Sequence, residues 1–86
     1  MNNIETRILE IFNQKLGFDQ KELETKTFAM LEMDELDMIM LAVCLEDEFK
    51  IIIDDEKLIN IKSFRALVTF IKSELEKEAE ETEKTV

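Results

Sequence analysis

The stretch MDELDMIMLAVCLEDEF (residues 33–49) is acidic at both ends and carries eight consecutive apolar residues, 38–45, between them. A surface helix normally shows one apolar stripe and one polar face, whereas this stretch is apolar almost all round. At about 100° per residue, its apolar side chains fall on two opposite sides of a helix. One set comprises Met38, Leu41, Ala42, Leu45 and Phe49, and the other comprises Leu36, Ile39, Met40 and Val43. We expect the first set to face the core and the second to be partly exposed.

The start of this helix is predicted by its capping residues. Asp34 is a good N-cap, and Asp37 completes a capping-box-like pair, with aspartate in place of Glu or Gln. Glu35 then lies in the first turn, where the positive end of the helix dipole favours a carboxylate. The sequence therefore predicts a helix over residues 35–49.

The second apolar set allows two interpretations. With Glu46 and Asp47 beside it, this side of the helix resembles a docking patch with a charged rim. Alternatively, a long loop that the sequence predicts at residues 19–33 folds over this side and buries it. Met40 fits both interpretations, because methionine packs adaptably in cores and at binding surfaces.

The rest of the chain predicts two further main helices and one short helix. Apolar residues at helical spacing indicate a helix at residues 3–16, closed by Gly17, and a last helix capped by Ser63. Residues 55–59 predict a short helical turn, and the isoleucines at 51–53 predict an extended connector that buries alternate side chains. The apolar positions of the two main helices are Ile4, Ile8, Ile11, Phe12, Leu16, Phe64, Leu67, Val68, Ile71 and Leu75.

Together these segments predict an all-α fold, a small four-helix bundle of three main helices and one short helix with a long first loop. The composition agrees, because the chain has no proline, one glycine and many strong helix formers. Its 86 residues make one domain. We assign residues 1–79 to that domain and expect the charged residues 80–86 to form a frayed C-terminal tail.

Charge and composition narrow the possible partners. The net charge is −10, from 21 acidic and 11 basic residues. Such a surface repels nucleic acid and anionic lipid and favours proteins with basic patches. A single cysteine excludes an internal disulfide. Because we find no secretory leader and no apolar stretch of about 18 residues, we expect a cytoplasmic protein without membrane insertion.

The sequence lacks the residue combinations on which the common catalytic sites depend. The chain has no histidine, so Cys44 lacks a partner that would activate it as a nucleophile, and we expect it to be a small half-buried hydrophobe. The acidic clusters at 34–37, 46–48 and 54–56 lack the glycine and ligand spacing of an EF-hand, and we interpret them as solvated helix ends rather than metal sites. Glycine-rich phosphate loops and zinc spacings are missing too. We therefore expect a protein that is not an enzyme.

The central segment resembles that of a known family. LEMDELDMIMLAVCLEDEFKIII (31–53) is similar to the central segment of acyl carrier proteins, whose pattern is roughly LGxDSLDxVELVxxLEEEFxIxI. IETRILEIFNQKLGF (4–18) resembles the first helix of that family, and DDEKLINIKSFRALVTFIKSEL (54–75) resembles its short third helix and last helix. The resemblance covers nearly the whole chain and implies the acyl-carrier type of four-helix bundle.

The sequence departs from the family pattern at the residue to which the family's prosthetic group is attached. In acyl carrier proteins, the serine of Asp-Ser-Leu bears 4′-phosphopantetheine through a phosphodiester, and the thiol of this arm holds the acyl chain as a thioester. Here the triplet is Asp34-Glu35-Leu36, and a glutamate offers no hydroxyl to a phosphopantetheinyl transferase. Neither Ser63 nor Ser73 lies at the start of the corresponding helix, so we expect no 4′-phosphopantetheine.

The resemblance also implies a partner-binding surface. The family's apolar partner-facing positions and recognition acids correspond to Leu36, Ile39, Val43, Asp37, Glu46 and Asp47, and Met40 replaces a partner-facing acid. The implied partners are proteins with basic docking patches, such as carrier-dependent synthases or transferases. Two further departures from the family pattern are Glu32 in place of the usual glycine and Asp54 in place of the usual proline.

The sequence leaves three functions open. The first is a carrier-like protein without a prosthetic group, which docks onto enzymes of fatty acid, polyketide or peptide synthesis as an adaptor or regulator. The second is an acyl carrier protein whose native serine was altered to Glu35, where the carboxylate would also mimic the charge of the phosphoryl group. The third is an acidic helical interaction domain unrelated to acyl chemistry.

Overall fold

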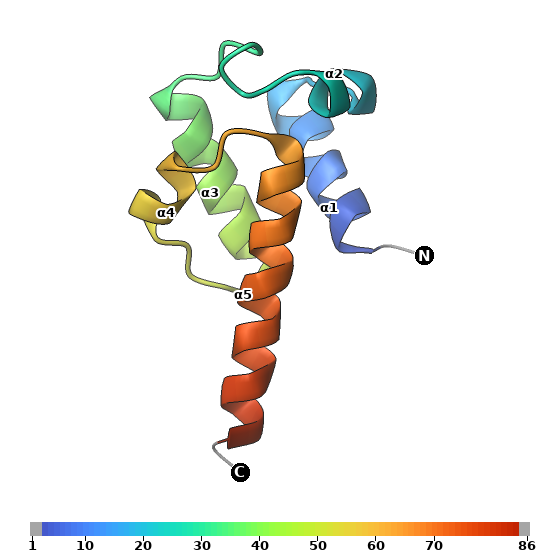
Figure 1. Ribbon diagram of the computed structural model, residues 1–86. Helices are drawn as coiled ribbons and strands as arrows, with labels where there is room; N and C mark the ends of the chain where they lie inside the picture. Colours follow the sequence, from blue (N-terminus) through green and yellow to red (C-terminus); the bar gives the residue numbers. More distant parts are fainter. Residues whose placement is uncertain (1–2, 85–86) are drawn as a thin grey trace.

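The computed structural model describes the backbone of residues 3–84 and the side chains of residues 3–77. The elements in chain order are α1 (Ile4–Ile11), η1 (Phe12–Leu16), α2 (Gln20–Thr25), α3 (Glu35–Phe49), α4 (Asp55–Ile59) and α5 (Phe64–Lys84). α1 packs against both α3 and α5, α4 packs against α3, and α2 contacts α5 (Figure 1). Residues 3–84 contain no strand, and the predicted all-α bundle is confirmed.

The first predicted helix divides into two parts. Asn3 caps α1, because its Oδ1 accepts the Thr6 N–H at 2.8 Å. From Phe12 the helix widens to π spacing, and it ends at Gly17, whose φ of 78° lies in the left-handed region. The N–H groups of Gly17 and Phe18 both donate to the Phe12 carbonyl, five and six residues back. The single α-helix predicted over 3–16 is therefore wrong in its last turn, which closes on a wider ring.

The predicted loop at 19–33 contains a helix that we did not predict. In α2 the Asp19 carboxylate accepts the Glu22 N–H at 2.8 Å, and the Glu22 carboxylate accepts the Asp19 N–H at 3.3 Å. This capping box starts a helix that Leu23, only 2% exposed, pins to the core. After α2 the chain turns, and the Phe28 N–H donates to the Lys62 carbonyl at 2.9 Å. A loop remains only over residues 26–34.

The start and end of α3 agree with the prediction. Asp34 Oδ1 accepts the Asp37 N–H at 2.9 Å, and Asp37 Oδ2 accepts the Asp34 N–H at 3.2 Å. This reciprocal pair is the predicted capping box, here with aspartate at both positions. The helix ends at Phe49 because Lys50 adopts the left-handed conformation, with a φ of 57°.

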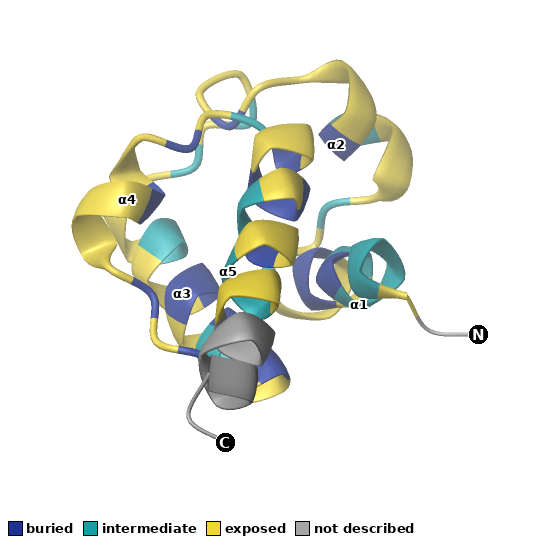
Figure 2. Cartoon of the chain, turned by 60° about the horizontal axis from the view of Figure 1, so that its bottom comes forward, coloured by how far each residue is buried: buried dark blue, intermediate teal, exposed yellow. Residues whose placement is uncertain are grey.

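The core side of α3 is also as predicted. Figure 2 shows buried residues turned toward the centre of the bundle. Leu41 and Leu45 are fully buried, Ala42 and Phe49 are 5–6% exposed, and Met38 packs partly buried beside them. Phe12 lies at the centre of the bundle, with its ring 5.7 Å from that of Phe28 and 5.8 Å from that of Phe64, the latter edge-on. Such aromatic contacts add to the burial of apolar area that stabilises the fold.

Short segments complete the bundle. In the connector, Ile51 and Ile53 are each 5% exposed and Ile52 is 89% exposed, which confirms the predicted alternation. The predicted short turn is α4, and the Ser63 hydroxyl accepts the Ala66 N–H at 3.2 Å, as expected of a cap for α5. Glu74 on α5 lies 3.8 Å from Lys57 Nζ, which links α5 to α4.

The last helix continues past the domain boundary that we predicted at residue 79. α5 runs to Lys84, and Figure 1 shows its C-terminal part extending beyond the other helices. The frayed tail predicted for 80–86 stays a prediction, and residues 85–86 lie outside the described residues. In the part of the chain that the structure describes, no helix combines the length and apolar character that crossing a membrane requires.

Candidate functional site at the N-terminal half of α3

The outer side of α3 exposes a row of large apolar side chains. Leu36 is 74% exposed, Ile39 51%, Met40 47% and Val43 59%. We call these four residues the α3 apolar strip. They belong to the set that the sequence predicted to be partly exposed, so the alternative in which the 19–33 loop buries them is wrong. α2 draws that loop toward α5 instead.

A groove of about 550 Å³ lies beside the strip, between the first two turns of α3, the turn after Phe28 and α4. Its walls are mainly apolar, and its charged residues are three carboxylates and one ammonium. The lining residues are Phe28, Ala29, Met33, Asp34, Glu35, Met38, Ile39, Asp55, Leu58, Ile59, Ile61 and Lys62. Ile39 belongs both to this groove and to the α3 apolar strip.

Glu35 is the first residue of α3 and lies at the rim of the groove. Its side chain is exposed, and among residues 3–77 no hydrogen bond or ion pair uses its carboxylate. The adjacent capping box fixes the helix start through Asp34 and Asp37. Residue 35 therefore presents its side chain to solvent at a helix N-terminus, where the dipole favours a negative charge.

The hydroxyl groups of the two serines lie elsewhere in the fold. Ser63 caps α5 through its hydrogen bond to Ala66. Ser73 is exposed within α5. As the sequence predicted, neither serine lies at the N-terminus of α3.

Two of the three predicted recognition acids also have structural roles. Asp37 completes the α3 capping box, and Glu46 Oε2 accepts the N–H of the buried Ile53 at 2.9 Å. No local pattern indicates the Glu46 contact, because its donor lies beyond the end of the helix. Asp47 is 87% exposed at its side chain and lies 3.7 Å from Lys50 Nζ. Of the three, Asp47 presents its carboxylate most freely to a partner.

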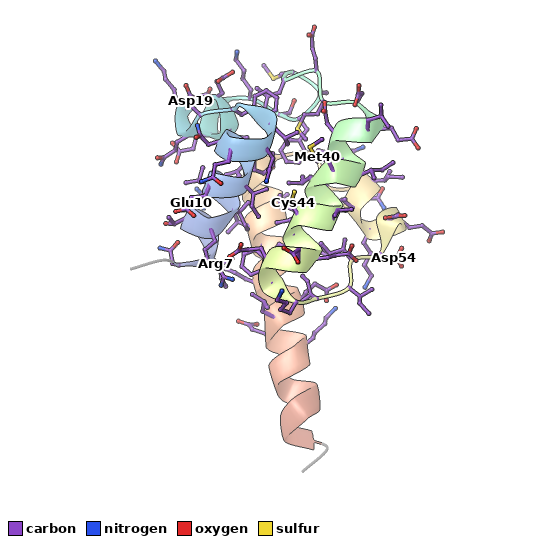
Figure 3. The ribbon with its side chains drawn as sticks, turned by 180° about the vertical axis from the view of Figure 1, so that it is seen from behind. Arg7, Glu10, Asp19, Met40, Cys44 and Asp54 are labelled. Carbon is purple, nitrogen blue, oxygen red and sulfur yellow. The ribbon has the colours of Figure 1, made fainter. Side chains whose placement is uncertain are left out.

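Cys44 lies on the flank of α3 that faces α1. It is half-buried, as predicted, and lines a shallow hollow of about 350 Å³ with Arg7 and Glu10. Figure 3 shows Met40 and Cys44 on α3, with Arg7 and Glu10 on the neighbouring α1. Within the described residues, no three acidic or cysteine side chains gather closely enough to hold a metal ion.

Glu32 has a backbone conformation that glycine adopts more easily. Its φ of 59° is in the left-handed region, where most residues with a Cβ are strained. The turn that contains it closes through the Glu32 N–H, which donates to the Ala29 carbonyl at 3.1 Å. The family pattern quoted above has a glycine at this position, and that glycine was the available signal for the left-handed turn.

Comparisons with known proteins agree on one family. Residues 6–71 match the family model described as "Phosphopantetheine attachment site". The acyl carrier protein homolog of Mycoplasma genitalium is 42% identical over 65 residues, which are 76% of each chain. The acyl carrier protein of Buchnera aphidicola is 34% identical over 74 residues, which are 84% of this chain and 95% of the relative.

A solved structure supports the same assignment. The crystal structure of acyl carrier protein from Thermotoga maritima superposes with a TM-score of 0.67 at 35% identity, covering 83% of this chain and 85% of that one. Helix order, sequence similarity and the family model therefore agree. This chain belongs to the acyl carrier protein family.

Proposed function

We propose that this member of the acyl carrier protein family does not carry 4′-phosphopantetheine at Glu35. It docks instead onto enzymes of fatty acid, polyketide or peptide synthesis as an adaptor or regulator. The observation that carries the proposal is the position of Glu35, the first residue of α3 at the rim of the groove, where the family pattern has its serine. The family is one of carriers rather than catalysts, so we expect no catalytic activity of its own.

The chemistry of residue 35 does not fit the family's prosthetic group. A serine hydroxyl forms a phosphodiester, whereas a carboxylate has no hydroxyl oxygen from which such a bond could be made. Ser63 is the serine closest to Glu35 in the sequence, and its hydroxyl caps α5. Residue 35 therefore offers the prosthetic group no oxygen for attachment through a phosphodiester.

The docking part of the proposal is supported by exposure and charge. The α3 apolar strip is 47–74% exposed, and such an apolar centre with charged residues around it is typical of protein interfaces. Asp47 follows Val43 by one helical turn and is exposed at the edge of the strip. A net charge of −10 favours encounter with basic protein surfaces.

Intact mass after incubation with coenzyme A and a broad-specificity phosphopantetheinyl transferase tests the first part. We expect the mass of the chain to stay unchanged, and the addition of one phosphopantetheine group would overturn the proposal. Glu35→Ser restores the hydroxyl at the same position and is expected to gain that mass. Glu35→Ala is the matched control, because it removes the carboxylate without supplying a nucleophile.

The adaptor role needs a separate measurement, binding to purified carrier-dependent synthases and transferases. We expect binding that weakens as salt rises, because exposed charges contribute to it. The same affinity at low and high salt, or no binding to any such enzyme, would contradict an acid-rimmed interface. Loading of Glu35→Ser without binding of the wild-type chain would show that docking requires the prosthetic arm.

A further inference from the structure

The groove beside Glu35 has the walls of a site for an apolar group. Three of its lining residues are buried side chains, with Leu58 3% exposed, Ile61 9% and Phe28 5%. Met33 and Met38 are partly buried in the same walls. The volume of about 550 Å³ lies within the range of protein sites that hold small ligands and leaves room for a bulky side chain.

The mouth of this groove is acidic. Asp34, Glu35 and Asp55 contribute three carboxylates, and Lys62 contributes the one ammonium group among the lining residues. The Lys62 Nζ donates to the Ile59 carbonyl at 3.1 Å, which places its charge at the end of α4. A ligand with a cation next to an apolar group is complementary to this arrangement, and an anionic one is not.

The groove and the α3 apolar strip form one continuous surface. Ile39 is 51% exposed and lines the groove, one helical turn after Glu35. Ile59 on α4 lines the opposite wall and is 63% exposed. A partner segment whose side chain fills the groove can therefore also lie along the rest of the α3 apolar strip.

From this geometry we infer the chemistry of the partner, an inference that rests on the proposed function. The groove takes a bulky apolar side chain of a partner protein, and an adjacent Lys or Arg of that partner pairs with the Glu35 carboxylate. The rest of the partner segment lies along the α3 apolar strip as an amphipathic helix does in a groove. A second copy of this chain does not fit, because it would bring the same carboxylates to the contact.

Selection from a displayed peptide library against the immobilised full chain tests this inference. We expect enriched peptides to share a bulky apolar residue beside Lys or Arg. On binding, they should shift the backbone amide resonances around residues 35–39 and 58. Peptides without a cation, a footprint elsewhere on the chain, or the absence of enrichment would overturn the inference.

Variants of both molecules sharpen the test. Glu35→Gln should weaken binding of a selected peptide by about fivefold, and Glu10→Gln on α1 should leave its affinity unchanged. Replacing the apolar anchor of the peptide by alanine should weaken binding by about tenfold or more. Equal losses in the two glutamine variants would contradict pairing at Glu35.

Other occupants give distinct outcomes. If the amide resonances of the same region shift as the concentration of the chain alone is raised, a second copy of the chain occupies the surface. Shifts on titration with dodecanoate, expected to be negligible, would assign the groove to an alkyl anion. Both results would overturn the inference, whereas the proposed function is tested separately by the mass after transferase treatment and by binding to purified carrier-dependent enzymes.

Discussion

The carboxylate of Glu46 holds the backbone of Ile53, accepting its N–H at 2.9 Å across the end of α3. Ile53 is 5% exposed, so loss of the acceptor leaves a poorly solvated donor. We expect Glu46→Ala to lower the free energy of unfolding by about 1–2 kcal/mol, measured by urea denaturation. Glu46→Gln, which keeps an oxygen acceptor, should lose about half as much. Equal losses in the two variants would contradict a role for this hydrogen bond.

A substitution of Asp47 tests docking separately from folding stability, because the Asp47 carboxylate is exposed. Asp47→Lys should change the free energy of unfolding by no more than about 0.5 kcal/mol and weaken binding to a basic carrier-dependent transferase by about fivefold at low salt. Isothermal titration calorimetry at two salt concentrations measures both the loss and its screening. Glu24→Lys, on α2, makes the same change of charge away from the strip. If both variants lose affinity equally, net charge rather than the α3 surface determines binding.

The left-handed backbone at Glu32 predicts a stabilising substitution. Glu32→Gly removes a Cβ at a φ of 59°, which relieves about 1–2 kcal/mol of strain against an entropic cost of about 0.5–1 kcal/mol. We expect a net gain of about 0.5–1 kcal/mol in thermal or chemical denaturation. Lys50→Gly, at a φ of 57°, should gain similarly, whereas Glu24→Gly inside α2 should lose about 1 kcal/mol.

Arg7 joins α1 to the end of α3 through three contacts. Its Nε donates to Glu48 Oε2 at 2.8 Å, its Nη2 donates to the Glu48 carbonyl at 2.9 Å, and its guanidinium lies 4.4 Å from the centre of the Phe49 ring. A lysine cannot reproduce this planar fork, so Arg7→Lys should lower the free energy of unfolding by about 1 kcal/mol. Lys15→Met, at an exposed position of η1, is the control and should have little effect. An unchanged midpoint for Arg7→Lys would show that the contacts are replaceable by water.

Residue 35 should be nearly neutral for folding. The capping box that starts α3 uses Asp34 and Asp37, and the Glu35 carboxylate contributes only through the helix dipole, worth about 0.3–1 kcal/mol at an exposed site. Glu35→Ser should therefore lower the free energy of unfolding by less than about 1 kcal/mol. A larger loss would indicate a structural contact of Glu35.

Local patterns predicted much of this fold. The capping aspartates and the two-sided apolar spacing of α3 are patterns of residues that lie close together in the sequence, so they can be recognised without knowledge of the fold. The structure confirms both α3 and the exposure of its apolar strip. The capping box of Asp19 and Glu22 has the same spacing and is the sequence signal for α2, but the scattered apolar residues around it favour a loop. The hydrogen bond of Glu46 could not be predicted, because it depends on how the connector folds back after Lys50.

The independence of the α3 capping box from residue 35 has a consequence for descent within the family. A helix whose capping residues flank an exposed site should accept either a hydroxyl or a carboxylate at that site with only a small change in stability. Selection on folding should therefore oppose exchange between the two side chains there only weakly. A replacement at residue 35 thus changes the chemical group that is offered to modifying enzymes and leaves the start of α3 in place.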